Sequence, residues 1–186
     1  MSYAFQASIL ADFEEMLKWK PEVRQVDWSE IVKESSELAD EGINTNYYGA
    51  KGMVEAFLSL LELSNSPRIV NVSSSMGKLN KLTNEWAKGI LSDAEALTEE
   101  KIDEVVAKYL KDFEEGSPET KGWPKFMSAY VVSKAAMSAC TSSGQELCCK
   151  TDINGNTGSF VNLVLQPHGG PTGCFFFRNE VSSYNE

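Results

Sequence analysis

The sequence predicts a protein of the α/β class that is built on a parallel sheet. Residues 68–74 form a short β-branched run between Pro67 and Gly77, with the apolar character of a strand that is buried on both faces. Stretches with helical periodicity precede and follow this run. The 186 residues, of which 42% are hydrophobic, fit one globular domain, so we assign residues 1–186 to a single domain.

Helices are expected before the strand. Residues 1–26 carry apolar side chains at helical spacing up to Pro21, which interrupts the pattern. Residues 27–42 begin with a helix-capping pattern, and Gly42 is expected to weaken or end this predicted helix. A further helix is expected to start near Asn46 and to end at residues 65–67, because a proline cannot continue the helical hydrogen bonds.

A polar and acidic stretch follows the strand. Residues 92–95 match a capping box, and Thr98 is a suitable cap for a helix. The predicted apolar face of that helix consists of Ile102, Val105, Val106, Leu110 and Phe113. Residues 126–142 are predicted to form a helix rich in Ala and Ser. Residues 143–158 show no clear period, and residues 174–177 are a second candidate strand.

Composition argues against several classes of function. The net charge of −10 repels phosphate backbones, so we expect no nucleic-acid partner. No apolar run approaches the roughly 18–20 residues of a membrane span, and the first residues do not resemble a signal peptide. We therefore expect a cytoplasmic protein with no membrane partner. His168 and the four cysteines lack the spacing of metal ligands, so no metal site is expected.

The strongest chemical signal is the pair Tyr130 and Lys134. Residues four apart lie one above the other on a helix face. A free phenol has a pKa of roughly 10, and a fixed ammonium group nearby favours the phenolate form. Such a pair can act as a general acid or base, although the same spacing also arises by chance on many helices.

Two further groups of residues could belong to the same site. Ser73, Ser74 and Ser75 follow the predicted strand, at the edge where open α/β sheets bind ligands. A hydroxyl there can polarise a carbonyl oxygen, although solvated serines in a simple turn are the alternative. Asn46 is unfavourable within a long helix, which indicates either a local bend or a specific contact.

Together and in this order, these residues resemble the Asn–Ser–Tyr–Lys tetrad of the short-chain dehydrogenase/reductase family. The similarity is strongest to its plant carbonyl-reductase-like branch, in which a long insertion precedes the tyrosine helix; residues 78–127 look like that lid-like insertion. The other matching segments are residues 26–30, 45–51, 150–154 and 169–177.

The resemblance implies a role for each residue. Tyr130 would donate a proton to a substrate carbonyl, and Lys134 would assist it and bind the nicotinamide ribose. Ser74 would bind the carbonyl oxygen, with either neighbouring serine as a register alternative. Asn46 would hold a water of the proton relay, and Thr151 would contact the carboxamide. The family therefore implies an NADP-dependent reduction of a ketone or aldehyde, with a menthone-like or alkaloid-ketone-like substrate.

One part of the family pattern has no counterpart in this sequence. The glycine-rich turn T-G-x-x-x-G-I-G, which lets the backbone approach a pyrophosphate, does not occur. We therefore expect an incomplete Rossmann-like fold, the remnant of a doubly wound parallel sheet without its first strands. Two alternatives to an active reductase stay open. One is a catalytically inactive truncated remnant, and the other is a non-catalytic module that associates with a full-length relative.

Overall fold

The computed structural model describes residues 34–65, 69–116, 118–142, 148–152, 175–177, 180–182 and 184. All of these belong to one compact unit, Glu34–Glu186. The helices expected within residues 1–33 lie outside the described residues.

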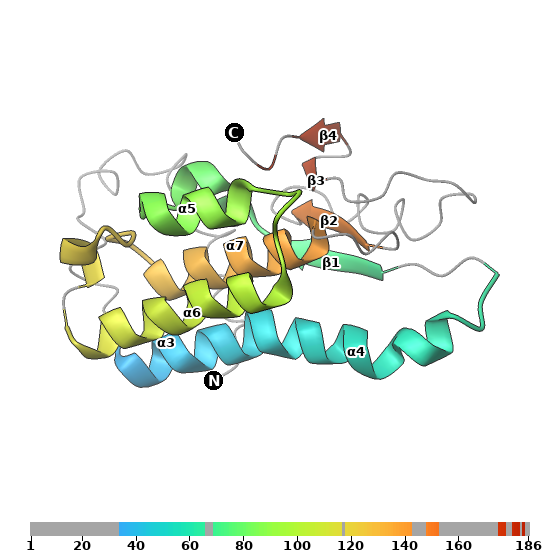
Figure 1. The fold of residues 1–186 in the computed structure, drawn as a ribbon, viewed down its shortest axis with the longest axis horizontal. Helices are drawn as coiled ribbons and strands as arrows, with labels where there is room; N and C mark the ends of the chain where they lie inside the picture. Colours follow the sequence, from blue (N-terminus) through green and yellow to red (C-terminus); the bar gives the residue numbers. More distant parts are fainter. Residues whose placement is uncertain are drawn as a thin grey trace, which may run out of the picture. The chain divides into compact units, whose positions relative to one another are not determined.

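The first described helices form one continuous rod (Figure 1). Helix α3 (Ser36–Ile43) passes into the π-helical turn η2 (Asn44–Tyr48) and then into α4 (Gly49–Leu61). Ser35 caps the start of α3 by accepting a hydrogen bond from the amide of Leu38. Gly42 was expected to weaken or end the helix, and an end at this residue is wrong. Gly42 is buried within α3, where close packing stabilises the helix despite the low helix propensity of glycine.

A second group of helices packs on this rod. Helix α7 (Ser128–Ser142) contacts α3, η2 and α6 (Glu99–Glu114), and α6 also contacts α3. The shorter helix α5 (Glu85–Ser92) lies against α6 and α7. The three helices α3, α6 and α7 lie side by side in Figure 1. Among the described residues, no helix is long and apolar enough to cross a membrane.

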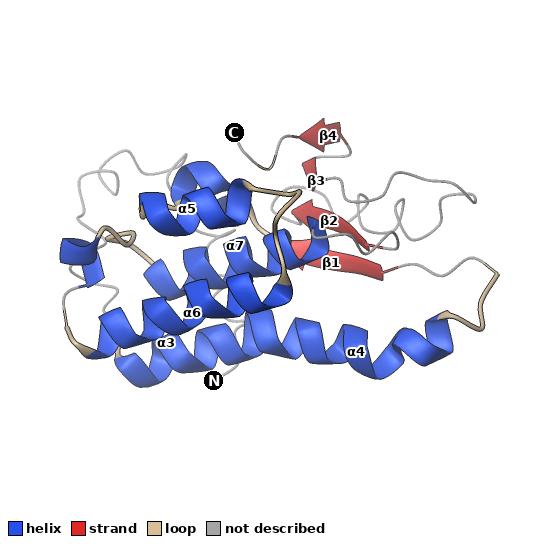
Figure 2. Ribbon diagram, in the orientation of Figure 1, coloured by secondary structure: helices blue, strands red, loops and turns tan. Residues whose placement is uncertain are grey.

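The strands make one sheet in the order β1-β2-β3-β4 (Figure 2). Strand β1 (Ile69–Ser73) pairs in parallel with β2 (Cys148–Asp152), and β2 pairs in parallel with β3 (Phe175–Phe177). Strand β4 (Glu180–Ser182) is antiparallel to β3. The expected strands at residues 68–74 and 174–177 are confirmed, whereas β2 and β4 were not predicted.

The core lies between the helices. Ala39, Ile43 and Tyr47 from the rod meet Val132 and Ala136 of α7, and all five are at most 1% exposed. The apolar face predicted for α6 is confirmed, with Ile102, Val105 and Val106 fully buried and Leu110 and Phe113 packed at the margin of the core. The Ala-rich face of α7 lets its neighbours approach closely, so this helix lies at the centre of the packing.

Candidate active site

The serines at the carboxyl end of β1 lie against α7. Ser73 and Ser74 are almost fully buried, at 3% and 0% exposed, and Ser75 is half-buried. The hydroxyl of Ser73 forms a hydrogen bond of 2.6 Å with that of Ser138 on α7. The hydroxyl of Ser74 accepts a hydrogen bond from the amide of Met76, 3.2 Å away, so its own proton can still be donated.

Tyr130 and Lys134 lie on one side of α7, as their spacing predicts. The Nζ atom of Lys134 is 5.9 Å from the ring centroid of Tyr130, within the range of a cation–π contact. The same ammonium group donates a 3.0 Å hydrogen bond to the carbonyl of Val72, two residues before Ser74. Lys134 therefore links the tyrosine of α7 to the carboxyl end of β1.

Gly77 brings the serine turn into close contact with α7. The turn η3 (Ser75–Gly77) packs directly on this helix. A Cβ atom built on Gly77 would lie 2.7 Å from Cβ of Lys134 and 2.8 Å from its carbonyl carbon. Only a residue without a side chain fits at this point, so the distance between the serine turn and Lys134 depends on Gly77.

Asn46 reaches the same helix from the π-helical turn. Its side-chain amide donates to the hydroxyl of Ser133, 3.1 Å away, and that hydroxyl donates to the carbonyl of Tyr130 at 3.0 Å. Ser133 directly precedes Lys134, so Asn46 contacts the segment of α7 between the tyrosine and the lysine. The extra residue of a π-turn re-aims side chains and is frequent at functional sites, which gives Asn46 a structural reason to interrupt the helix.

A polar cluster beside Asn46 ties the rod to α6. The hydroxyl of Tyr47 donates to Asp103 at 2.8 Å, and Lys51 contacts Asp103 at 3.0 Å and Glu99 at 3.2 Å. Burial and the bond to Asp103 raise the pKa of Tyr47 far above its usual value. Burial lowers the pKa of Lys51, but its bonds to Asp103 and Glu99 outweigh this and raise it. Both groups keep their protons at neutral pH and act as donors.

The remaining site residue of the prediction lies in the sheet. Thr151 is in β2, in register with Val72 of β1, and therefore close to the end of the strand where the serines begin. Its side chain lies outside the described part of the structure. The structure thus brings Asn46, Ser74, Tyr130 and Lys134 around the first half of α7, with the backbone of Thr151 on the neighbouring strand.

The site also contains residues that sequence reasoning missed. Ser133 and Ser138 bond to Asn46 and Ser73, and no pattern within an Ala- and Ser-rich helix indicates which hydroxyls face a partner. Glu34 accepts hydrogen bonds at the start of α7, from a segment that is remote in sequence. Burial raises the pKa of the Cys140 thiol to about 11, which favours its protonated form.

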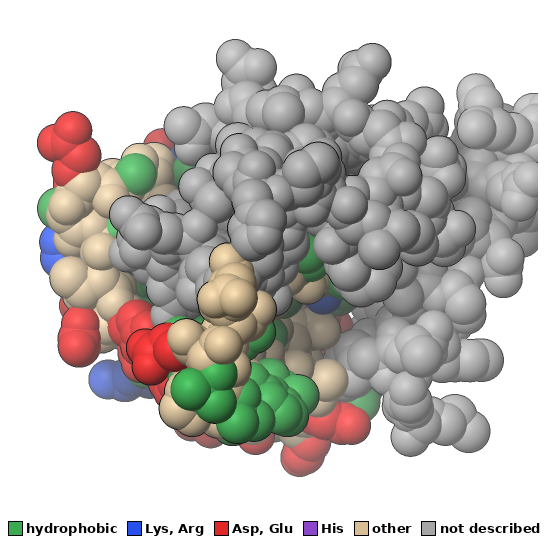
Figure 3. Space-filling view, turned by 90° about the vertical axis from the view of Figure 1, so that its right-hand side faces the viewer, with side chains coloured by type: hydrophobic (Ala, Val, Ile, Leu, Met, Phe, Trp, Pro, Cys, Tyr) green, Lys and Arg blue, Asp and Glu red, His purple; other side chains and the backbone are tan. Residues whose placement is uncertain are grey.

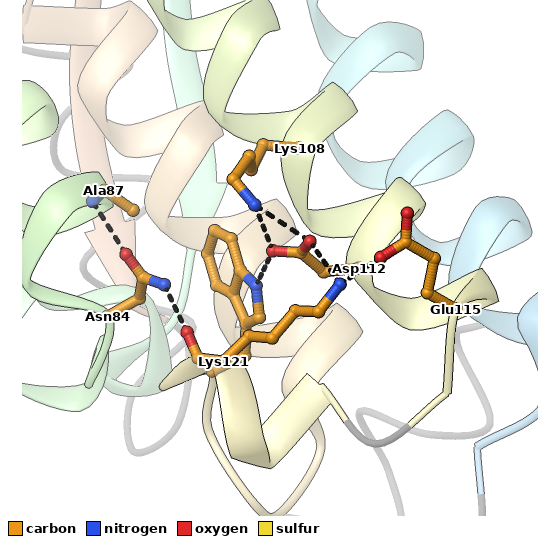
Figure 4. A network of polar contacts seen from close by, with 7 residues as sticks. Asn84, Ala87, Lys108, Asp112, Glu115 and Lys121 are labelled. Atoms are coloured by element: carbon orange, nitrogen blue, oxygen red, sulfur yellow. Dashed lines mark hydrogen bonds and ion pairs between the residues drawn. The ribbon is translucent and has the colours of Figure 1, made fainter.

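A network of charged and polar side chains joins α6 to the segment that precedes α7 (Figure 4). The carboxylate of Asp112, only 3% exposed, accepts hydrogen bonds from Lys108, Lys121 and the indole of Trp123. Burial raises the pKa of Asp112, but these donors outweigh it and lower the pKa to about 2. Lys121 also pairs with Glu115. This network closes the loop after α6 and leads the chain into α7.

Comparisons with known proteins point to one family. No protein-family model matches the chain. A (+)-neomenthol dehydrogenase from Capsicum annuum is 53% identical over 80% of this chain. A protein named short-chain dehydrogenase/reductase 1 from Saponaria officinalis is 42% identical over 86% of it. The solved structure of a menthone neomenthol reductase from Mentha piperita superposes on 80% of the chain with 48% identity and a TM-score of 0.73.

The chain belongs to the short-chain dehydrogenase/reductase family. The fold of the matching part is that of the plant reductases of this family, since both sequence and backbone agree over most of the chain. The chain spans 54% of the length of the Capsicum relative and 53% of the Mentha structure.

Proposed function

We propose that this short-chain dehydrogenase/reductase chain carries the acid–base half of an NADPH-dependent carbonyl reductase, with Tyr130 as the proton donor. The observation that supports this most directly is the placement of Lys134, which lies against the Tyr130 ring and bonds to the end of β1 beside the serine turn. A tyrosine, a lysine and a serine turn on adjoining elements are the groups that an alcohol-forming proton transfer needs.

Each residue has a distinct part in the proposal. Bound NADPH would supply hydride to the carbonyl carbon. Tyr130 gives its phenolic proton to the carbonyl oxygen, and Ser74 or the more exposed Ser75 donates a hydrogen bond to the same oxygen. Lys134 holds the ribose hydroxyls while its charge favours the phenolate left on Tyr130. Asn46 connects this segment of α7 to a water relay. The relatives' names make a cyclic ketone of the menthone type the first substrate to test, ahead of an alkaloid ketone.

The candidate site residues among the described part of the chain match one end of the cofactor, the nicotinamide end. Lys134 of α7 bonds to the carboxyl end of β1 and contacts the Tyr130 ring, and Thr151 lies in the neighbouring strand β2. In the proposal these three residues would hold the nicotinamide ribose and carboxamide. The glycine-rich turn for the pyrophosphate has no counterpart in the sequence. We propose that β1 to β3 form one part of a doubly wound parallel sheet. Cofactor binding is therefore the measurement that decides the proposal.

The test is a titration of NADPH followed by nicotinamide fluorescence, together with turnover of menthone. We expect saturable binding by the natural chain, and weaker binding by a Tyr130→Phe, Lys134→Met double variant. Tyr130→Phe alone should lower turnover by roughly 10²- to 10⁴-fold, the usual contribution of a general acid. If a chain that is folded by circular dichroism fails to bind NADPH, it is not a reductase on its own.

One observation supports a second function, association with a full-length relative. No residue of α4 is buried, and Met53, Phe57 and Leu60 are 58%, 46% and 59% exposed along one side of the helix. Hydrophobic side chains gather in Figure 3, which views the structure from the side on which α4 ends. An exposed apolar face of this kind is typical of a protein interface.

Size-exclusion chromatography of the chain with a full-length plant reductase of the family tests this second function. We expect a complex with the natural chain, and loss of the complex with Phe57→Lys. Ser59→Lys introduces the same charge on the other side of α4 and is the matched control. Separate elution of the natural chain and the relative would exclude this partner.

A further inference from the structure

Helix α7 has no capping side chain of its own. The carbonyl of Met127 accepts the first helical hydrogen bond, from the amide of Val131 at 2.9 Å, so Met127 occupies the N-cap position. A methionine has no strong acceptor for the free amides of the first turn. Its φ of 50° lies in the left-handed region, which residues other than glycine seldom adopt. The helix therefore starts from a strained residue without a local cap.

A carboxylate from a remote segment takes the place of the cap. Glu34 precedes α3, and its Oε2 atom accepts a 2.8 Å hydrogen bond from the hydroxyl of Ser128. The amide of Ala129 points at both carboxylate oxygens, at 3.3 and 3.4 Å. A negative charge at this end of a helix is favoured by the helix dipole. Burial nevertheless raises the pKa of Glu34, although its bonds to Ser128 and Ala129 partly offset this.

The start of α7 is also hydrogen-bonded to helix α6. The hydroxyl of Ser128 forms a buried 2.8 Å hydrogen bond with that of Tyr109 on α6. Glu34, Ser128 and Tyr109 thus connect the start of α3, the start of α7 and the insertion helix. Strained backbone persists only where the surroundings over-determine it, and this cluster provides that constraint at Met127. Tyr130 is the second residue after Ser128.

We infer that Glu34 is a positioning residue for Tyr130. Its carboxylate caps α7 at Ser128 and Ala129 and so fixes the first turn of the helix, which carries the Tyr130 side chain. Lys134 is bound separately to the Val72 carbonyl, so the distance between the tyrosine and the lysine depends on how the first turn is held. The inference rests on the proposed function of Tyr130 as proton donor. It extends the site to a residue that touches neither substrate nor cofactor.

The experiment compares Glu34→Ala and Glu34→Gln in the full chain. Glutamine keeps an acceptor oxygen, so Glu34→Gln should retain most of the Tyr130 positioning and activity that Glu34→Ala loses. Glu41→Ala is the matched control, because Glu41 is an exposed carboxylate on the neighbouring helix α3. The first readout is the Tyr130 signal in the NMR spectrum of the chain labelled with ¹³Cε-tyrosine, assigned with Tyr130→Phe. The second is kcat and KM for menthone reduction by NADPH.

We expect the Tyr130 signal to shift or broaden in Glu34→Ala and to return in Glu34→Gln, with no change in Glu41→Ala. kcat should fall roughly tenfold to hundredfold in Glu34→Ala, the range that a small misplacement of a reacting group produces, with KM changed much less. An unchanged Tyr130 signal in folded Glu34→Ala overturns the inference. If that signal moves as expected but the natural chain reduces no ketone, the proposed function fails and the positioning role stands.

Discussion

At the residue scale, Gly77 carries the tightest steric constraint described near the site. In Gly77→Ala the new Cβ would meet the backbone and Cβ of Lys134 at 2.7–2.9 Å, and a helix backbone cannot easily move away. We expect the free energy of unfolding to fall by about 1–3 kcal/mol, as for other overpacked sites, with reduced turnover because the serine turn shifts. Urea unfolding monitored by circular dichroism measures the first effect.

Gly89→Ala is the matched control for this substitution. Gly89 lies within α5, and apart from its chain neighbours and the backbone of its own helix no atom lies within 4 Å of the position of an added Cβ. Alanine there should stabilise the chain by roughly 0.5–1 kcal/mol, because it lowers the entropy of the unfolded chain. If Gly77→Ala and Gly89→Ala changed stability in the same direction, the contact between Gly77 and Lys134 would not be a constraint.

Asp112 predicts a dependence of stability on pH. Its pKa is about 2 in the folded chain, against 3.8 as the ordinary value. A lowered carboxyl pKa stabilises the fold above the unfolded pKa, and this contribution is lost as the pH falls through the folded pKa. Asp112→Asn should cost roughly 1–3 kcal/mol at pH 7, as for a hydrogen-bonded charged group. The difference in the free energy of unfolding between Asp112→Asn and the natural chain should shrink between about pH 4 and pH 2 in urea titrations. A difference that stayed constant over this range would contradict the assignment.

The site residues show which contacts a sequence can indicate. Tyr130 and Lys134 could be placed on one face from their spacing alone, because a helix fixes that geometry. The serine turn was placed next to a strand end for a similar reason. Ser133, Ser138 and Glu34 could not be identified, because their partners lie far away in the sequence and only the packed fold brings them together.

At the scale of elements, Asn84 both starts a helix and attaches it. Its side-chain oxygen caps α5 by accepting from the amide of Ala87 at 3.0 Å, and its amide donates to the carbonyl of Lys121 at 2.8 Å (Figure 4). Asn84→Ala should lose about 1–2 kcal/mol of stability. Asn84→Asp keeps the cap and loses only the bond to Lys121, so its loss should be smaller. Thermal unfolding of the two variants separates the roles, and equal losses would show that the cap contributes nothing.

The elements differ in how well the sequence predicts them. Thr98 caps α6 as expected, and α7 agrees closely with the predicted range, because caps and periodicity act locally. The capping box at residues 92–95 is wrong as a helix start. Asp93 accepts from the amide of Ala96 in a turn, and the helix lies before it. Strand β2 has no clear pattern of its own and is defined by its pairing with β1, which is a non-local interaction.

At the scale of the whole molecule, the negative charge opposes association between copies of the chain, whereas the exposed apolar face of α4 favours it. The net charge of −10 at neutral pH keeps copies apart, and it vanishes near the sequence pI of about 4.7. We expect light scattering to rise steeply as the pH approaches that value, because the apolar face of α4 can then associate. Phe57→Lys should reduce the scattering and Ser59→Lys should do so less. Equal effects of the two variants would show that charge alone controls association.

The contacts of Tyr184 have a consequence for synthesis on the ribosome. Its hydroxyl donates to the carbonyl of Ala135 on α7 at 2.8 Å, and its own carbonyl accepts from the amide of Leu79 at 3.0 Å. Both partners emerge from the exit tunnel well before Tyr184 has been translated. Helices α5, α6 and α7 can form early, but these two bonds close only after Tyr184 itself has left the tunnel. Until then, the Leu79 amide must be satisfied by water or by a chaperone, whereas the Ala135 carbonyl already accepts a hydrogen bond within α7.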